Sequence, residues 1–345
     1  MALNLGLLVF SFIITSILIV PFINLLYKLR FTRRIEAPKK GKIPQFDKLH
    51  DTKAGTPIGG GVLVVGVVFI LFMIIFPLIR RFGVYIEGAH NISSEINIIF
   101  FAFLSFAVLG LYDDFVKLYR KMEPGKIGMW VGLRRKQKFA LQCLIALILG
   151  FLIYYDLGVS IIHLPLLDRV VDLGIWYIPF AAFVIVSFVN AVNITDGLDG
   201  LMPGILLICL FAFWIIAASV FDTPLSVFIS LWIGALIAFL YFNIWPARIM
   251  IGDSGALSFG ATLAVVGLLT GKIFVLAIVG GLFVAEVASS LIQISARKIL
   301  GRPILPGSPV HFMLQLRGWE EPKIVMRAWL AAIMLAVFGL WLALI

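Results

Sequence analysis

The sequence predicts an all-α, polytopic membrane protein with about ten transmembrane helices, and three observations lead to this prediction. Hydrophobic residues make up 62% of the 345 residues and charged residues only 13%, with a mean hydropathy of +1.09, far above that of a soluble domain. Apolar stretches of the ~20 residues needed to cross a bilayer recur along the chain. Lysine and arginine gather in alternate connecting segments. Residues 1–345 are expected to form a single integral-membrane domain.

Ten candidate spans follow one another along the chain. They cover residues 3–26, 58–79, 96–112, 139–155, 174–190, 203–221, 225–242, 254–270, 273–296 and 326–345. The first is expected to be a true span and not a cleavable signal peptide, because its basic residues follow the apolar run instead of preceding it. An even number of spans places both termini on the same side of the membrane.

The charge distribution predicts which side that is. With the N-terminus outside, the inner segments are residues 27–57, 113–138, 191–202, 243–253 and 297–325. Together with Arg327 they hold 24 of the 28 lysine and arginine residues, so the positive-inside rule places them in the cytoplasm and both termini outside. They also hold eleven of the eighteen acidic residues. Carboxylates beside hydrocarbon cost about 2.5–3.5 kcal/mol each and repel one another, which favours a metal-dependent site at the cytoplasmic surface.

The second inner segment begins with two adjacent carboxylates. Asp113 and Asp114 directly follow an apolar span, and Lys117 comes one helical turn later. This composition suits a site in which one carboxylate orients a metal and another accepts a proton or holds a charge. The alternative is a solvated span end, although span ends on this side usually carry lysine or arginine. Lys138 opens the following span, and by itself it is a topological signal.

The third inner segment, residues 190–201, interrupts the hydrophobic pattern most strongly. Its polar side chains recur every three residues, at Asn190, Asn193, Asp196 and Asp199. A strict helix would spread them over about half of its circumference, so Gly197 and Gly200 are expected to break the backbone and let them converge. Amides with carboxylates suit recognition of a nucleobase, a sugar or a phosphate-bound metal. A purely structural turn, the alternative, rarely needs so many buried polar groups.

Three further inner segments carry weaker signals. Lys53 and Thr56 lie in a glycine-rich stretch whose backbone can approach an anion, although it equally suits a helix contact. Asn243 precedes Asp253, which stands between polar and glycine residues at a span entrance and is either a helix N-cap or a metal ligand. His311 lies among basic residues and suits a phosphate or sugar contact, although a lone loop histidine is more often a surface residue.

Taken together and in order, these motifs resemble the polyprenyl-phosphate N-acetylhexosamine-1-phosphate transferases over residues ~50–330, and within them the enzymes of bacterial peptidoglycan synthesis. The matching motifs are Gly55-Thr-Pro57, Asp113-Asp114 with Lys117, Asn190 to Leu201, Asn243 with Gly252-Asp253-Ser-Gly255, Glu286 with Ile292-Gln293, and Gly318-Trp319-Glu-Glu-Pro-Lys323 running into Arg327. Two departures stand out. Only His311 remains of a run of three histidines, and Ile58-Gly59 replaces a Thr-Met pair.

The resemblance implies transfer of phospho-MurNAc-pentapeptide from UDP-MurNAc-pentapeptide to undecaprenyl phosphate, giving lipid I and UMP. It implies Asp113, Asp114 and Asp253 as catalytic residues, with Mg²⁺ held by Asp253 and Asp114. The residues that it implies for substrate binding are Lys53, Thr56, Lys117, Lys138, Asn190, Asn193, Asp196, Asp199, Asn243 and His311. It further implies a multi-pass protein of the bacterial cytoplasmic (inner) membrane, with its active site facing the cytoplasm, that pairs into a homodimer.

Several alternatives stay open at this point. A sister enzyme would use UDP-GlcNAc or another UDP-HexNAc as donor, and the two missing histidines keep this choice and that of a diverged, inactive paralogue open. A cation transporter would need its acids near the middle of the membrane on broken helices, whereas here they gather at inner span ends. The residues also do not decide between a single displacement and a two-step route through a covalent intermediate.

Overall fold

The computed structural model describes residues 2–33, 53–81, 86–119, 133–164 and 169–345. Within these ranges nine helices are long and apolar enough to cross a membrane, and a tenth span results if the bent pair α10–α11 counts as one. The predicted fold class is confirmed. The helices are α1 (Ala2–Lys28), α3 (Gly60–Arg81), α4 (Ile92–Tyr119), α5 (Arg135–Asp156), α6 (Tyr177–Thr195), α7 (Leu201–Ser219), α8 (Thr223–Asn243), α9 (Gly252–Leu269), α10 (Ile273–Val279), α11 (Gly281–Ile299), α12 (Val310–Leu316) and α13 (Glu321–Leu344).

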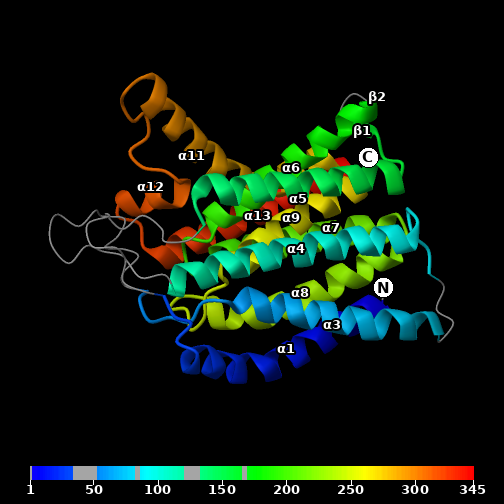
Figure 1. Cartoon of the computed structure of the whole chain (residues 1–345), viewed down its shortest axis with the longest axis horizontal. Coiled ribbons are helices and arrows are strands. Elements are labelled where there is room, and N and C mark those ends of the chain that lie inside the picture. Colours follow the sequence, from blue (N-terminus) through cyan, green and yellow to red (C-terminus); the bar gives the residue numbers. More distant parts are fainter. Residues whose placement is uncertain (1, 34–52, 82–85, 120–132, 165–168) are drawn as a thin grey trace.

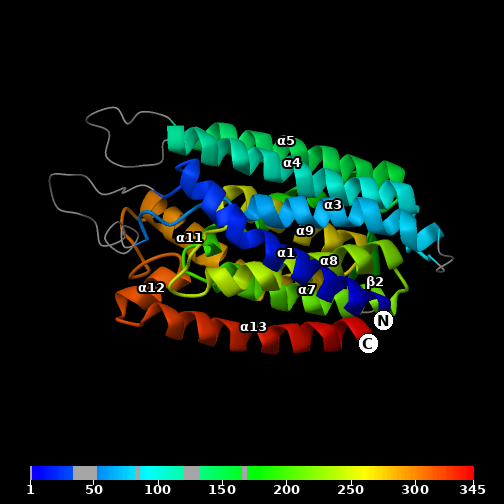
Figure 2. The same cartoon turned by 90° about the horizontal axis from the view of Figure 1, so that it is seen from below.

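The long helices run side by side along the longest axis of the molecule (Figure 1). Helix α9 lies at the centre, where it packs against α3, α4 and α6 and is buried almost throughout. Helix α8 packs against α1, α3 and α7. Figure 2 shows α4 and α5 along one edge of the bundle and α13 along the other, with both chain ends at the same end. The start of α13, and with it α12, lies at the opposite end.

The predicted span 273–296 is not one continuous helix. It breaks at Gly280 into α10 and α11, whose axes differ by 80°, and α11 swings away from the bundle in Figure 1. Helix α11 is amphipathic: Leu291 and Ile294 are exposed, whereas Glu286 and Gln293 are buried. The hydropathy pattern predicts an apolar segment of the right length, but it does not predict the bend.

A small antiparallel hairpin departs from the all-helical pattern. Strand β1 (Ile161–Leu164) pairs with β2 (Arg169–Asp172), and Ile161 lies opposite Asp172. These residues fall between the predicted spans 139–155 and 174–190. In Figure 1 the hairpin lies at the end of the bundle that also holds the chain ends.

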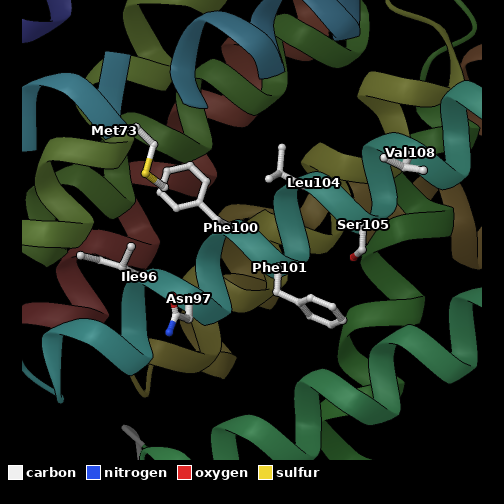
Figure 3. A pocket seen from close by; sticks show the side chains of 8 residues that line it. All are labelled: Met73, Ile96, Asn97, Phe100, Phe101, Leu104, Ser105 and Val108. Atoms are coloured by element: carbon white, nitrogen blue, oxygen red, sulfur yellow. The ribbon is translucent and has the colours of Figure 1, made fainter. Parts of the chain in front are cut away.

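A surface cavity of about 480 Å³ opens along α4 and is shown in Figure 3. It is lined by Met73 of α3 and by uncharged α4 side chains between Ile96 and Val108. Its lining, as described, carries no charged side chain, and its polar groups are those of Asn97 and Ser105. The acidic pair Asp113–Asp114 lies further along the same helix, so the cavity is separate from the residues discussed below.

Two buried carboxyl groups meet at the end of the bundle that holds the chain ends. Glu95 in the first turn of α4 is fully buried beside Asp222, which is 2% exposed, and neither carboxyl oxygen of Glu95 has a donor among the other described residues. Asp222 also caps α8 by accepting the Leu225 N–H at 3.1 Å. Burial raises the pKa of the Asp222 carboxyl, which lies just outside the span. Two ionised carboxylates have no donor between them, so the contact requires one shared proton.

Replacing Glu95 with Gln should therefore leave stability within about 1 kcal/mol, because the amide still donates to Asp222. Glu95→Ala should cost about 2–3 kcal/mol, since it removes the donor and leaves a void beside a buried carboxylate. Thermal unfolding in detergent measures both, with Asn97→Ala on the exposed face of α4 as the control. Equal losses in the Gln and Ala variants would contradict the shared proton.

Candidate active site

Four charged side chains from three helices form what we call the carboxylate–lysine cluster. Asp113 and Lys117 of α4 lie one turn apart, with 3.1 Å between Asp113 Oδ2 and Lys117 Nζ. Lys138 of α5 donates to the same oxygen at 3.0 Å and also to Asp253 Oδ2 of α9. Lys117 Nζ reaches Asp253 Oδ2 at 2.7 Å, and Leu133 N–H donates to Asp113 Oδ1 at 2.8 Å. Two lysines thus bridge carboxylates that lie 140 positions apart in the sequence.

Asp114 makes a different set of contacts from its neighbour. Its two carboxylate oxygens accept the backbone N–H groups of Asp253 at 3.2 Å and Ser254 at 3.1 Å. Both N–H groups belong to the first turn of α9, where backbone donors have no acceptor within the helix and a negative charge is favourable. Gly252, just before them, has a φ of 78°, a conformation that favours glycine. Asp114 therefore fixes the start of α9 and, through it, the position of the Asp253 side chain.

Glycines let α4 and α3 come close to the start of α9. A Cβ added at Gly110 of α4 would lie 2.1 Å from the carbonyl oxygen of Asp253, and one added at Gly61 of α3 would lie 2.3 Å from the Cα of Gly255. Neither position accepts a larger residue without moving a backbone. Close packing through glycines is common between membrane helices, and here it sets the distance between Asp113 and Asp253.

A second group of charges surrounds residues 196–200, which we call the 196–200 turn. Lys53 Nζ donates to Asp199 Oδ1 at 2.7 Å and to Glu321 Oε1 at 2.5 Å, and it lies 3.4 Å from the carbonyl oxygen of Gly197. The Asp199 N–H donates to the same Glu321 oxygen at 2.5 Å. All three charged side chains are at most 12% exposed. As predicted, the helix ends here, and Gly200 adopts a positive φ of 77°.

Neighbouring elements hold the same turn from the other side. Asn243, at the end of α8, accepts the Gly200 N–H at 3.1 Å through its side-chain oxygen. Asp199 Oδ2 accepts the Ala247 N–H at 2.9 Å. Trp329 of α13 donates its indole N–H to the Gly200 carbonyl at 3.1 Å. The turn is thus built from α6, α8 and α13, which explains why its conformation needs the complete bundle.

The electrostatics of Asp196 connect the two groups of charges. Burial, followed by the Asp253 carboxylate, raises the pKa of Asp196 to about 7, whereas Lys53 and Arg33 lower it and Asp199 raises it. Asp196 belongs to the 196–200 turn, and the Asp253 carboxylate of the carboxylate–lysine cluster acts on it as well as Lys53. The two groups therefore adjoin at the end of the bundle away from the chain ends.

The remaining polar residues of this region have supporting positions. Asn190 donates to Gln142 Oε1 of α5 at 3.0 Å and to the Val186 carbonyl of its own helix at 2.8 Å. Among the described contacts, then, Asn190 joins α5 to α6 and does not touch the acids. Asn193 is half-buried on the last turn of α6, and Thr56 is half-buried just after Lys53.

His311 is not the surface loop residue that a lone histidine usually is. It lies in the first turn of α12 and is 4% exposed. Its Nδ1 is 3.1 Å from Glu286 Oε2 of α11, and its backbone N–H donates to Glu286 Oε1 at 3.1 Å. The ring edge lies against Gly197, where an added Cβ would come within 2.5 Å of Nε2. Gln293, two turns further along α11, accepts the Leu305 N–H at 3.0 Å.

The sequence alone predicts no role for Glu321 or Gln142, and it leaves open whether Glu286 lines a groove or bonds to neighbouring helices. Glu321 stands in the Gly318–Lys323 motif, directly before a proline that opens the last span, so a carboxylate at a span start was the available signal. The motif does not predict the contact of Glu321 with Lys53, because the two residues are 268 positions apart. Gln142 looks like an ordinary polar residue within α5, and no signal in the sequence marks it.

The carboxylate oxygens in and beside the carboxylate–lysine cluster suit a hard divalent cation as ligands. Asp113, Asp114 and Asp253 provide only carboxylate oxygens, and with Lys117 and Lys138 the five groups carry a net charge of −1 when ionised. Among the described residues, however, His, Cys, Asp and Glu side chains do not form a ready group of three or more that encloses an ion. Mg²⁺ usually takes one or two carboxylates and completes its shell with water and substrate phosphates, so the residues fit that mode of binding.

Comparison with known proteins places this geometry in a family. Residues 96–271 match the model described as glycosyl transferase family 4, which is half of the chain. A phospho-N-acetylmuramoyl-pentapeptide-transferase of Caldanaerobacter subterraneus subsp. tengcongensis is 35% identical over 312 residues, covering 90% of each chain. This chain belongs to the phospho-N-acetylmuramoyl-pentapeptide-transferase family. The family predicted from the sequence motifs is thereby confirmed.

Other members of the phospho-N-acetylmuramoyl-pentapeptide-transferase family match over similar lengths. The enzyme of Aquifex aeolicus is 35% identical over 348 residues, covering 94% of this chain and 91% of the relative. That of Bacillus subtilis is 33% identical over 332 residues, covering 96% and 94%. With its apolar helices, this family membership makes the chain a bacterial integral membrane protein. The matched model includes the carboxylate–lysine cluster and the 196–200 turn, but ends before His311 and Glu321.

Proposed function

We propose that the protein transfers phospho-MurNAc-pentapeptide from UDP-MurNAc-pentapeptide to undecaprenyl phosphate, yielding lipid I and UMP for peptidoglycan synthesis. The observation that carries the proposal is the junction of Asp113 and Asp253, bridged by two lysines, beside a turn rich in carboxylate and amide groups. This junction occurs in a chain that is 35% identical, over 90% of its length, to a protein named for this transfer. The site lies at the predicted cytoplasmic end, where basic segments would attract an anionic nucleotide donor.

The chemistry requires positioning more than acid–base strength. An oxygen of the lipid phosphate attacks the β-phosphorus of the donor, and the bond from that phosphorus to the bridging oxygen breaks, so that UMP leaves with the oxygen. One pyrophosphate linkage is lost and one is formed, so the step is nearly balanced in energy. Catalysis then rests on holding two anions in line and neutralising their charge. A phosphate monoester has a second pKa of about 6, so the acceptor is already mostly ionised near neutral pH.

Each group of residues has a place in this step. Asp113 contacts the acceptor phosphate and orders the two lysines, whose ammonium groups neutralise phosphate oxygens. Asp253, with Asp114, would hold Mg²⁺, which supplies further charge neutralisation on the donor's diphosphate. The residues proposed to recognise the uridine nucleotide or to support the metal are Asn193, Asp196 and Asp199. Those proposed to hold donor phosphates and sugar are Lys53, Thr56 and His311.

The choice of donor is the open alternative, because only one of the family's three consecutive histidines is present, at His311. Purified protein should be incubated with polyprenyl phosphate and, separately, UDP-MurNAc-pentapeptide or UDP-GlcNAc, and the lipid products weighed by mass spectrometry. We expect a product with the mass of lipid I only in the first reaction. A product formed from UDP-GlcNAc instead would assign the protein to the sister activity.

Mg²⁺ uptake into proteoliposomes without any lipid product would support a transporter. Light scattering of the purified protein tests the proposed homodimer.

A further inference from the structure

Glu321 receives two hydrogen bonds on one oxygen from residues that are distant in the sequence. Its Oε1 accepts the ammonium of Lys53 and the backbone N–H of Asp199, each at 2.5 Å. Glu321 is the first residue of α13, and its side chain is 12% exposed. A carboxylate that satisfies both an ammonium and a backbone donor in a partly buried place forms strong, charge-assisted bonds.

Lys53 is consequently held between two carboxylates. It donates to Asp199 Oδ1 at 2.7 Å as well as to Glu321, and it approaches the Gly197 carbonyl at 3.4 Å. Without Glu321 the ammonium would keep Asp199 as its one ionic partner among the described residues, and the Asp199 N–H would lose its acceptor. Helix α13 also reaches the next residue of the turn, since Trp329 donates to the Gly200 carbonyl. The start of α13 thus fixes both the cation and the backbone of the 196–200 turn.

We infer that Glu321 is a positioning residue for donor binding, which holds Lys53 and the 196–200 turn in the arrangement that receives a uridine diphosphate. This inference rests on the proposed function. Glu321 acts through Lys53 and Asp199 and does not take part in bond breaking. Its loss should therefore weaken donor binding and leave the turnover of bound substrate nearly intact.

The test compares steady-state kinetics of the full-length protein with Glu321 replaced by Ala or Gln. We expect Glu321→Ala to raise the KM for the UDP-sugar about 10- to 100-fold, the effect of losing a charge-assisted hydrogen bond. Its kcat and its KM for polyprenyl phosphate should change less than about 3-fold. Glu321→Gln keeps an acceptor for the Asp199 N–H but loses the charge, so its donor KM should fall between those of Glu321→Ala and the wild type.

The matched control is Glu320→Gln, which removes the same charge at the exposed neighbouring position and should leave all constants unchanged. A double-mutant cycle with Lys53→Met completes the design. Because Glu321 acts partly through Lys53, Glu321→Ala should raise donor KM less in the Lys53→Met background than in the wild type, where only the loss of the Asp199 N–H acceptor remains to be felt. Calorimetric titration with UDP measures the binding loss without turnover.

The outcomes separate this inference from the proposed function. If the wild type uses a different UDP-sugar, the proposed donor is wrong, and the same comparison is made with the donor that it does use. If the wild type is active but Glu321→Ala retains its donor KM and UDP affinity, the inference alone fails. It also fails if Glu321→Gln lowers the unfolding temperature while donor KM stays unchanged, because the residue is then only structural. A wild type that binds no UDP overturns both.

Discussion

Replacing Asp253 with Asn is expected to lower the transfer rate by about 10³-fold, which in effect abolishes transfer, while the protein still folds and inserts. Asp253 Oδ2 accepts hydrogen bonds from the ammonium groups of both Lys117 and Lys138, and it is the side chain that α9 adds to the carboxylate–lysine cluster. Asparagine keeps the volume but removes the charge that orders the lysines and that would hold a divalent cation. Losses of this size follow removal of a group that stabilises charge in the transition state.

Single-turnover rates with radiolabelled donor measure this effect, and size-exclusion chromatography in detergent reports folding. Asp222→Asn is the matched control, because it makes the same change at a buried acid at the other end of the bundle and should remain active. Chelating divalent cations should abolish the transfer activity of the wild type. Added Mg²⁺ should restore the activity of the wild type but not that of the Asp253→Asn variant. Near-normal turnover by Asp253→Asn would remove this residue from the site.

Asp113→Asn is expected to lower the transfer rate by at least ~10²-fold, the usual loss for a positioned acid–base or charge-organising group. Asp113 is 1% exposed, and its Oδ2 lies between the ammonium groups of Lys117 and Lys138 at 3.1 and 3.0 Å. An amide there either presents its N–H₂ donors to those cations or gives up the bond from Leu133 N–H. The acceptor phosphate would then meet disordered lysines.

Labelling of the wild-type protein distinguishes the two possible routes. In a single displacement, wild-type protein incubated with radiolabelled donor and no acceptor remains unlabelled. A phosphoryl-sugar adduct trapped on Asp113 would instead establish a covalent, two-step route. Tyr112→Phe, a change at the exposed neighbour, serves as the control and should retain the wild-type rate. Unchanged kinetics in Asp113→Asn would remove this carboxylate from catalysis.

The individual motifs could be read from the sequence because each depends on local composition. Twenty apolar residues in a row predict a span whatever its neighbours are, and the break at Gly197 and Gly200 follows from their position within a polar run. The bend of 80° between α10 and α11 could not be read in this way, because an apolar pattern has the same hydropathy in a straight or a broken helix. The burial of His311 also depends on Glu286, which belongs to a different helix.

By itself, the sequence determined that this protein is a bundle of membrane helices of a recognisable transferase family, with most of its acids gathered at one end. Hydropathy and charge are properties of each segment by itself, so spans and their orientation can be predicted without knowing how the helices pack. Only the tertiary structure decided the partners of those acids: Asp253 shares its lysines with Asp113, whereas Asp199 meets Lys53 and Glu321. These pairs form because glycine contacts set the distances between helices, and no single segment contains that information.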